Sequence, residues 1–112
     1  MKTFVRKFPE DHLKVPFDRG WGCGYVAIPV GHPWHGLEWD NAYNLIDIHG
    51  GVTFSQKAPK WAEKFGFDPE CWVIGFDTAH YGDNLETQNE QYVLDMTNNL
   101  LKQCEDVVVK TD

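Results

Sequence analysis

Four of the five histidines in this chain of 112 residues lie in three short polar segments, each with a glycine within two residues of a histidine. A carboxylate two or three residues from a histidine can hold the ring in one tautomer and raise its basicity. A nearby glycine lets a ligand approach the backbone closely. These are the ingredients of general acid–base catalysis or of metal binding. The segments are His32-x-x-His35, Asp47-x-His49 and Asp77-x-x-His80-x-x-Asp83.

The strongest candidate for acid–base catalysis is His49, followed by His80. Alternation along a strand would place His49 on a polar face, and the glycines that follow it would leave room for a ligand. Asp47 and Asp77 are the expected orienting carboxylates, one for each histidine. Six further residues are expected to contact the ligand: Trp34, His35, Gly50, Gly51, Thr53 and Asp83.

A divalent metal is the alternative cofactor for the same segments. Imidazole nitrogens together with carboxylate oxygens suit zinc, manganese or iron. No spacing matches an established signature such as HExxH, so a bound metal is the less favoured interpretation. The candidate metal ligands are His35, His49, His80 and Asp77.

Each polar segment also has a structural interpretation. Asp77 fits the cap of a turn after its strand. His32 and His35 fit an exposed aromatic loop, since prolines and glycines punctuate residues 31–39. Asp47 and His49 fit an ordinary solvated strand face.

The remaining aromatic and histidine residues favour structural roles. Trp21, Trp34 and Trp39 either belong to the core or wall a pocket for a flat ligand, and core packing is favoured for each. His12, beside Glu10 and Asp11, is predicted to lie on the surface.

Several other enzyme classes lack their motifs here. The sequence has no GxSxG nucleophile elbow, no phosphate-binding loop and no dinucleotide fingerprint. Its three cysteines form no CxxC pair, which argues against a zinc ribbon or a dithiol redox site.

Residues 46–55 (IDIHGGVTFS) decide how His49 is presented, and two structures compete for them. In a tight hairpin with Gly50-Gly51 as the turn, both faces would mix polar and apolar side chains. In one continuous, bent strand, polar and apolar residues would separate onto opposite faces. We therefore predict the continuous strand, with the glycines marking a bulge or the close approach of a ligand.

The rest of the chain alternates between strand and helix signals. Residues 24–30 and 71–78 are predicted strands, and residues 59–65 a short helix. The fold class is α+β: a mostly antiparallel sheet packed against one long C-terminal helix, plus the short helix around 59–65. The whole chain, residues 1–112, is expected to form a single domain.

The C-terminal helix is the clearest element. Thr87 and Glu90 have capping-box spacing, which predicts the start of a helix there. Residues 107–109 (VVV) predict a short final strand or an ordered tail. An apolar stripe at helical spacing indicates packing on the sheet; it consists of Val93, Met96, Leu100 and Cys104.

Composition limits the partners and the compartment. Seventeen acidic against ten basic side chains give a net charge of −7, which argues against generic binding to nucleic acid or anionic membranes. The sequence has no apolar run long enough for a signal peptide or a membrane span. Unpaired cysteines fit a reducing compartment, so we expect a cytoplasmic protein.

Three stretches of the sequence resemble blocks of small proteins encoded by bacteriophages and prophages. They are GYVAIPVGHPWHG, IDIHGGVTFS and WVIGFDTAHYGD, and the HGGxTF and GFDxAHxGD motifs are the distinctive parts. The similarity covers about residues 20–83 and implies an origin and a shared site, without naming a reaction. It implies that one pattern unites His35, Asp47, His49, Gly50, Gly51, Asp77, His80 and Asp83.

Three classes of function are compatible with these residues, and the least favoured is a purely structural or accessory phage protein with no site. The favoured one is a hydrolase-like enzyme acting on a small, nucleotide-like molecule by acid–base or metal-assisted chemistry. The alternative is a non-catalytic protein that binds a small molecule or blocks a host protein. The expected partner is accordingly a small molecule or a host protein, with no nucleic acid and no membrane.

Overall fold

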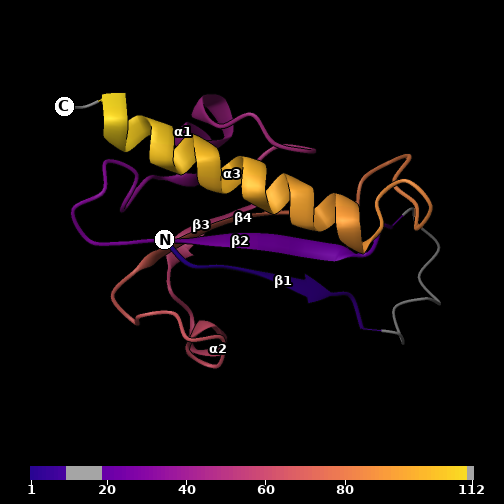
Figure 1. Ribbon diagram of the computed structural model, residues 1–112, viewed down its shortest axis with the longest axis horizontal. Helices are drawn as coiled ribbons and strands as arrows, with labels where there is room; N and C mark the ends of the chain where they lie inside the picture. The colour runs from indigo at the N-terminus through magenta and orange to yellow at the C-terminus, as the bar shows by residue number, and fades with distance from the viewer. Residues whose placement is uncertain (10–18, 111–112) are drawn as a thin grey trace.

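The fold is an antiparallel sheet covered on one face by a long helix, as predicted (Figure 1). The computed structural model describes residues 1–9 and 19–110, so His12 lies outside the described residues. The sheet has the strand order β1-β2-β4-β3. Its strands are β1 (Thr3–Lys7), β2 (Gly22–Ile28), β3 (Phe54–Lys57) and β4 (Trp72–Asp77).

The two central strands confirm the predicted strands at residues 24–30 and 71–78. They pair antiparallel, with Val26 opposite Ile74. Because successive side chains alternate between faces, Ile74 and Phe76 pack in the same cluster as the long helix, whereas Val73 packs on the other face. Alternating apolar residues on both faces explain why these strands lie in the middle of the sheet.

The long helix α3 (Glu90–Lys110) covers one face of the sheet, and its predicted stripe is confirmed. Val93, Leu100 and Cys104 are fully buried, and Met96 packs partly buried beside them. Gly24 of β2 permits this approach, because a Cβ atom there would overlap the Thr97 hydroxyl.

Both ends of α3 differ from the prediction. Its cap is Asn89 rather than Thr87, because the Asn89 side-chain oxygen accepts a hydrogen bond of 2.9 Å from the Tyr92 N–H. The strand or tail predicted for residues 107–109 is wrong, since the helix continues through them. Val107, three residues after Cys104, extends the apolar stripe and packs on the core, which overrides the β preference of a valine run.

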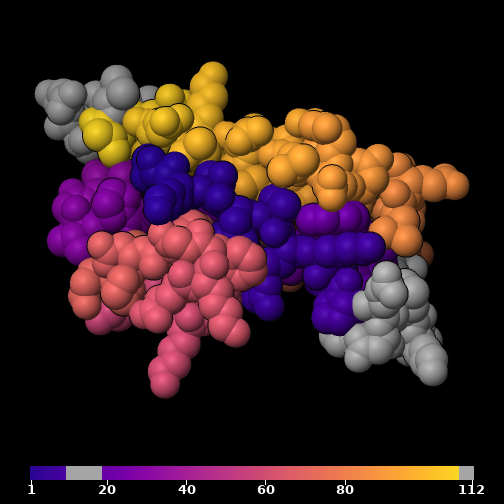
Figure 2. All heavy atoms as spheres, turned by 60° about the horizontal axis from the view of Figure 1, so that its bottom comes forward, coloured from indigo at the N-terminus to yellow at the C-terminus, as the bar shows by residue number. Residues whose placement is uncertain are grey.

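The opposite face of the sheet carries a smaller aromatic cluster around α2 (Lys60–Glu63), which confirms the short helix predicted near residues 59–65. The ring of Phe4 in β1 stacks on Phe65 and meets Phe67 edge-on. Figure 2 shows this side, where the segment around α2 (salmon) lies against the N-terminal residues (indigo). The sheet therefore has packed side chains on both faces.

The continuous strand predicted for residues 46–55 is wrong. A helix not predicted from the sequence, α1 (Trp39–Leu45), precedes a short extended segment, and β3 begins only at Phe54. Between them the Gly51 N–H donates to the Ile48 carbonyl, and Gly50 and Gly51 have φ values of +69° and +85°. Left-handed glycines reverse the chain in a turn, so His49 sits at a corner instead of along a strand.

No helix in residues 1–9 and 19–110 is long and apolar enough to cross a bilayer.

Candidate functional site

Two imidazoles and one carboxylate converge where the 49–50 turn meets the loop after β4. We call His49, His80 and Asp83 the His–Asp cluster. His49 Nε2 lies 2.9 Å from Asp83 Oδ1, and His80 Nδ1 lies 3.2 Å from Asp83 Oδ2. One nitrogen of each histidine and one carboxylate oxygen all lie within 4.8 Å of one another. The cluster therefore joins side chains that are 34 residues apart in the chain.

Asp83 is the buried centre of the cluster. Its side chain is only 5% exposed, and it is fixed by its own loop. Its Oδ2 accepts a hydrogen bond of 2.9 Å from the His80 backbone N–H, while its own N–H donates to the His80 carbonyl. This local pairing holds the carboxylate between the two rings before any ligand arrives.

Asp77 combines the two roles considered for it. Its Oδ1 accepts a hydrogen bond from the Ala79 N–H, which caps the turn that ends β4. The same oxygen lies 3.4 Å from His80 Nε2, on the side of the ring opposite Asp83. His80 is thus placed between two carboxylates.

Tyr92 completes the surroundings of His49, and the sequence did not reveal it. Its hydroxyl lies 2.7 Å from His49 Nδ1, and the two rings meet edge-on. Since an ionised Asp83 only accepts hydrogen bonds, neutral His49 carries its proton on Nε2 and accepts one from Tyr92 at Nδ1. The only sequence signal was its place beside the apolar stripe of α3, which suggests packing.

Gly50 is required both by the turn and by the cluster. A Cβ atom at this position would overlap the His80 ring. Its backbone is left-handed as well, so another residue would be strained even without that overlap. A Cβ atom at Gly51 would likewise overlap the ring of Tyr43. The paired glycines therefore make room for side chains of the protein itself.

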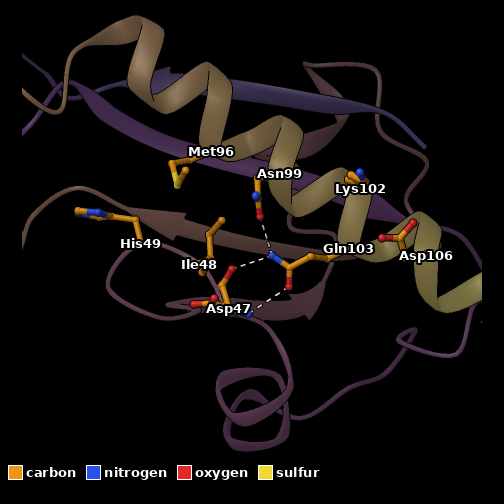
Figure 3. A pocket seen from close by; sticks show the side chains of 8 residues that line it. All are labelled: Asp47, Ile48, His49, Met96, Asn99, Lys102, Gln103 and Asp106. Atoms are coloured by element: carbon orange, nitrogen blue, oxygen red, sulfur yellow. Dashed lines mark hydrogen bonds between the residues drawn. The ribbon is translucent and has the colours of Figure 1, made fainter.

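A groove of about 490 Å³ extends from His49 along α3 (Figure 3). Its size suits a small molecule. One ammonium group, two amides and two carboxylates line it, together with the apolar side chains of Ile48 and Met96. The full lining is Asp47, Ile48, His49, Met96, Asn99, Lys102, Gln103 and Asp106.

Gln103 ties the segment before His49 to α3. Its amide oxygen accepts a 3.1 Å hydrogen bond from the Asp47 N–H, and its amide nitrogen donates to the Asp47 carbonyl at 2.7 Å. Figure 3 shows this pairing across the groove. The Gln103 amide thus makes the two hydrogen bonds with the Asp47 backbone that a neighbouring strand would make in a sheet.

Asp47 does not orient His49, contrary to the prediction. Both ring nitrogens of His49 are occupied by Asp83 and Tyr92. The Asp47 side chain is exposed and lines the groove instead. The prediction relied on both residues sharing one face of a strand, and the chain forms no strand there.

The loop histidines serve the fold and lie outside the cluster. Buried His32 bonds the Cys104 carbonyl through Nε2 and accepts the Trp34 N–H at Nδ1. His35 Nε2 contacts the Glu70 carbonyl at 2.9 Å, and His35 is not among the residues that the structure brings together in the His–Asp cluster.

Three tryptophans and Thr53 also lie apart from the cluster. Trp34 is buried in the core, and Trp21 packs against it, as favoured for both. Trp39 is instead half exposed on α1. Thr53 is exposed, and its backbone N–H bonds Gly75.

No protein-family model, curated protein or solved structure matches this chain. The resemblance to bacteriophage and prophage proteins therefore stays a prediction.

Proposed function

We propose that the protein is a hydrolase-like enzyme in which the His–Asp cluster activates a water molecule against a small, nucleotide-like substrate. The observation that carries the proposal is the convergence of His49 and His80 on buried Asp83, with Tyr92 on the far side of His49. Enzymes move protons between oxygen atoms along chains of hydrogen bonds that run from a carboxylate through an imidazole to a hydroxyl. Asp83, His49 and Tyr92 form such a chain.

The groove supports a small substrate. The groove begins at His49. Its Lys102 ammonium can bind an anionic group, and its Asn99 amide can hydrogen-bond the polar edge of a base. Ile48 and Met96 offer an apolar surface to a ring. A nucleotide combines these three properties in one molecule. The cytoplasm is the proposed compartment, because Cys23, Cys71 and Cys104 are all free thiols.

The direct test is hydrolysis of a panel of nucleotides and simple phosphate and carboxylate esters by the purified protein. We expect turnover of at least one substrate and a loss of about 100-fold or more in His49→Ala and Asp83→Asn, since positioned proton transfer contributes about that much. His35→Ala is the matched control, because it removes an imidazole outside the cluster. Circular dichroism confirms that each variant is folded.

A non-catalytic binder is the second candidate, and one observation favours it. Every ring nitrogen of His49 and His80 already has a partner: Asp83 and Tyr92 for one ring, Asp83 and Asp77 for the other. A general base needs a free lone pair facing the substrate. A small molecule retained from cell extract with unchanged mass, together with no turnover on the whole panel, would establish this function and exclude the hydrolase.

A further inference from the structure

We propose that the His–Asp cluster binds one divalent transition-metal ion through His49 Nε2, His80 Nδ1 and a carboxylate oxygen of Asp83. The inference rests on the proposed function for its catalytic meaning, because it specifies how that hydrolase would activate water. The binding itself is argued from the geometry alone.

The nitrogen and oxygen atoms of the cluster lie close enough together for one ion to reach all three side chains. Ligands of one tetrahedral zinc, bonded at about 2.0–2.1 Å, lie roughly 3.3 Å from one another. In the cluster, His49 Nε2 lies 2.9 Å from Asp83 Oδ1 and His80 Nδ1 lies 3.2 Å from Asp83 Oδ2, so the carboxylate faces both rings. One nitrogen of each ring and one carboxylate oxygen lie within 4.8 Å of one another, which places one ligand atom of each residue within reach of a single ion.

Each histidine also has a polar partner at the ring nitrogen that does not face Asp83 in the proposed ligand set. Metal-bound histidines nearly always bond a carboxylate, carbonyl or other polar group through the ring nitrogen that does not touch the metal. His80 has Asp77 at 3.4 Å from Nε2, and His49 has the Tyr92 hydroxyl at 2.7 Å from Nδ1. With an ion on Nε2, neutral His49 would carry its proton on Nδ1, and this N–H would donate a hydrogen bond to the Tyr92 hydroxyl oxygen.

The His–Asp cluster is accessible to an ion from one side. The carboxylate is buried, whereas the side chains of His49 and His80 are 17% and 31% exposed, so an ion can enter from the side of the rings. Three protein ligands leave a position for water, which is the arrangement of catalytic zinc sites. The ion also removes the objection that all ring nitrogens are occupied, because it activates water without a free imidazole.

The test is titration of the chelator-treated protein with Zn²⁺ by isothermal calorimetry. We expect one equivalent to bind, and His49→Ala, His80→Ala and Asp83→Ala each to weaken binding by more than about 10-fold. His35→Ala and Asp47→Ala are matched controls that remove an imidazole and a carboxylate outside the cluster, and they should bind as wild type. Thermal melting of each variant identifies loss of fold.

Tyr92→Phe and Asp77→Asn test the outer partners of the rings. Each retains all three ligands and should weaken Zn²⁺ binding by about 10- to 100-fold. The proposal is overturned if wild type binds no Zn²⁺, or if the three ligand variants bind as tightly as the controls.

The experiment separates this inference from the proposed function. One equivalent of Zn²⁺ bound through the cluster, with no hydrolysis of any substrate, would retain the metal site and reject the hydrolase. Hydrolysis that survives chelation and fails in His49→Ala, in a wild type that binds no Zn²⁺, would retain the hydrolase and reject the metal site.

Discussion

Asp83 is the residue on which both histidines depend. Its carboxylate is nearly excluded from solvent and contacts two imidazoles and a backbone N–H. A buried carboxylate is tolerated only with such partners, because its desolvation is otherwise costly. The proposed chemistry and the local stability of this loop therefore rest on the same three contacts.

Gly50 allows a test at the scale of one side chain. Gly50→Ala should lower the free energy of unfolding by about 1–2 kcal/mol from left-handed strain, and further because the new methyl group overlaps the His80 ring. Gly36 is the matched control: its φ is +86°, but a Cβ atom there meets nothing within 4 Å. Urea denaturation of both variants measures the difference.

The expected result is a larger loss of stability in Gly50→Ala than in Gly36→Ala. Equal losses would mean that the His80 ring moves aside without cost, and that the turn does not hold it.

Among the elements, the segment between α1 and β3 shows how a site residue is positioned without a strand. Its backbone is paired with the side-chain amide of Gln103 on α3. This explains why residues 46–55 could be predicted only in part. Ile46, Ile48 and Val52 are buried in one cluster, as the predicted alternation requires, whereas Phe54, predicted on the same face, packs against the opposite one. The segment pairs with a helix side chain 56 residues away from Asp47.

Gln103→Glu should loosen this segment. A carboxylate still accepts the Asp47 N–H but repels the Asp47 carbonyl, and the loss of this exposed hydrogen bond costs about 0.5–1.5 kcal/mol. Faster hydrogen exchange at the backbone amides of residues 47–49 is the expected result, measured by mass spectrometry or NMR. Asn98→Asp adds the same charge at an exposed position of α3 and is the control.

Unchanged exchange in Gln103→Glu would show that the turn alone holds His49. Acceleration in both variants would show an effect of charge on α3 rather than of the lost hydrogen bond.

At the scale of the whole molecule, buried hydroxyl and thiol groups make stability sensitive to alkali. Burial raises the pKa of the Cys104 thiol to about 12, from an ordinary value of 9.0, and also raises the pKa of Tyr25. Below pH 9 both groups are protonated in the folded and the unfolded chain. Above it, the unfolded chain releases protons that the folded chain retains, so stability falls as the pH rises toward 12.

The slope should reach about 1.4 kcal/mol per pH unit for each such group. Urea denaturation between pH 8 and 11 measures it, and Cys104→Ala should show a shallower fall than wild type. Thr97→Ala alters another buried residue of α3 without removing an ionisable group, and it should keep the steep fall. Parallel curves for all three proteins would contradict a protonated, buried thiol.

The α+β architecture can be predicted from the amino-acid pattern, because alternating apolar residues in β4 and the stripe of α3 each specify a buried face locally. The amino-acid sequence also singled out His49, His80, Asp83 and the glycine pair, whose residue types signal chemistry wherever they lie. Tertiary structure alone decided the partners. Asp83 replaced Asp47, and Tyr92 joined His49 from 43 residues away. Such contacts depend on how a turn, a loop and a helix meet in space, and the hydrophobic periodicity of each segment does not indicate that arrangement.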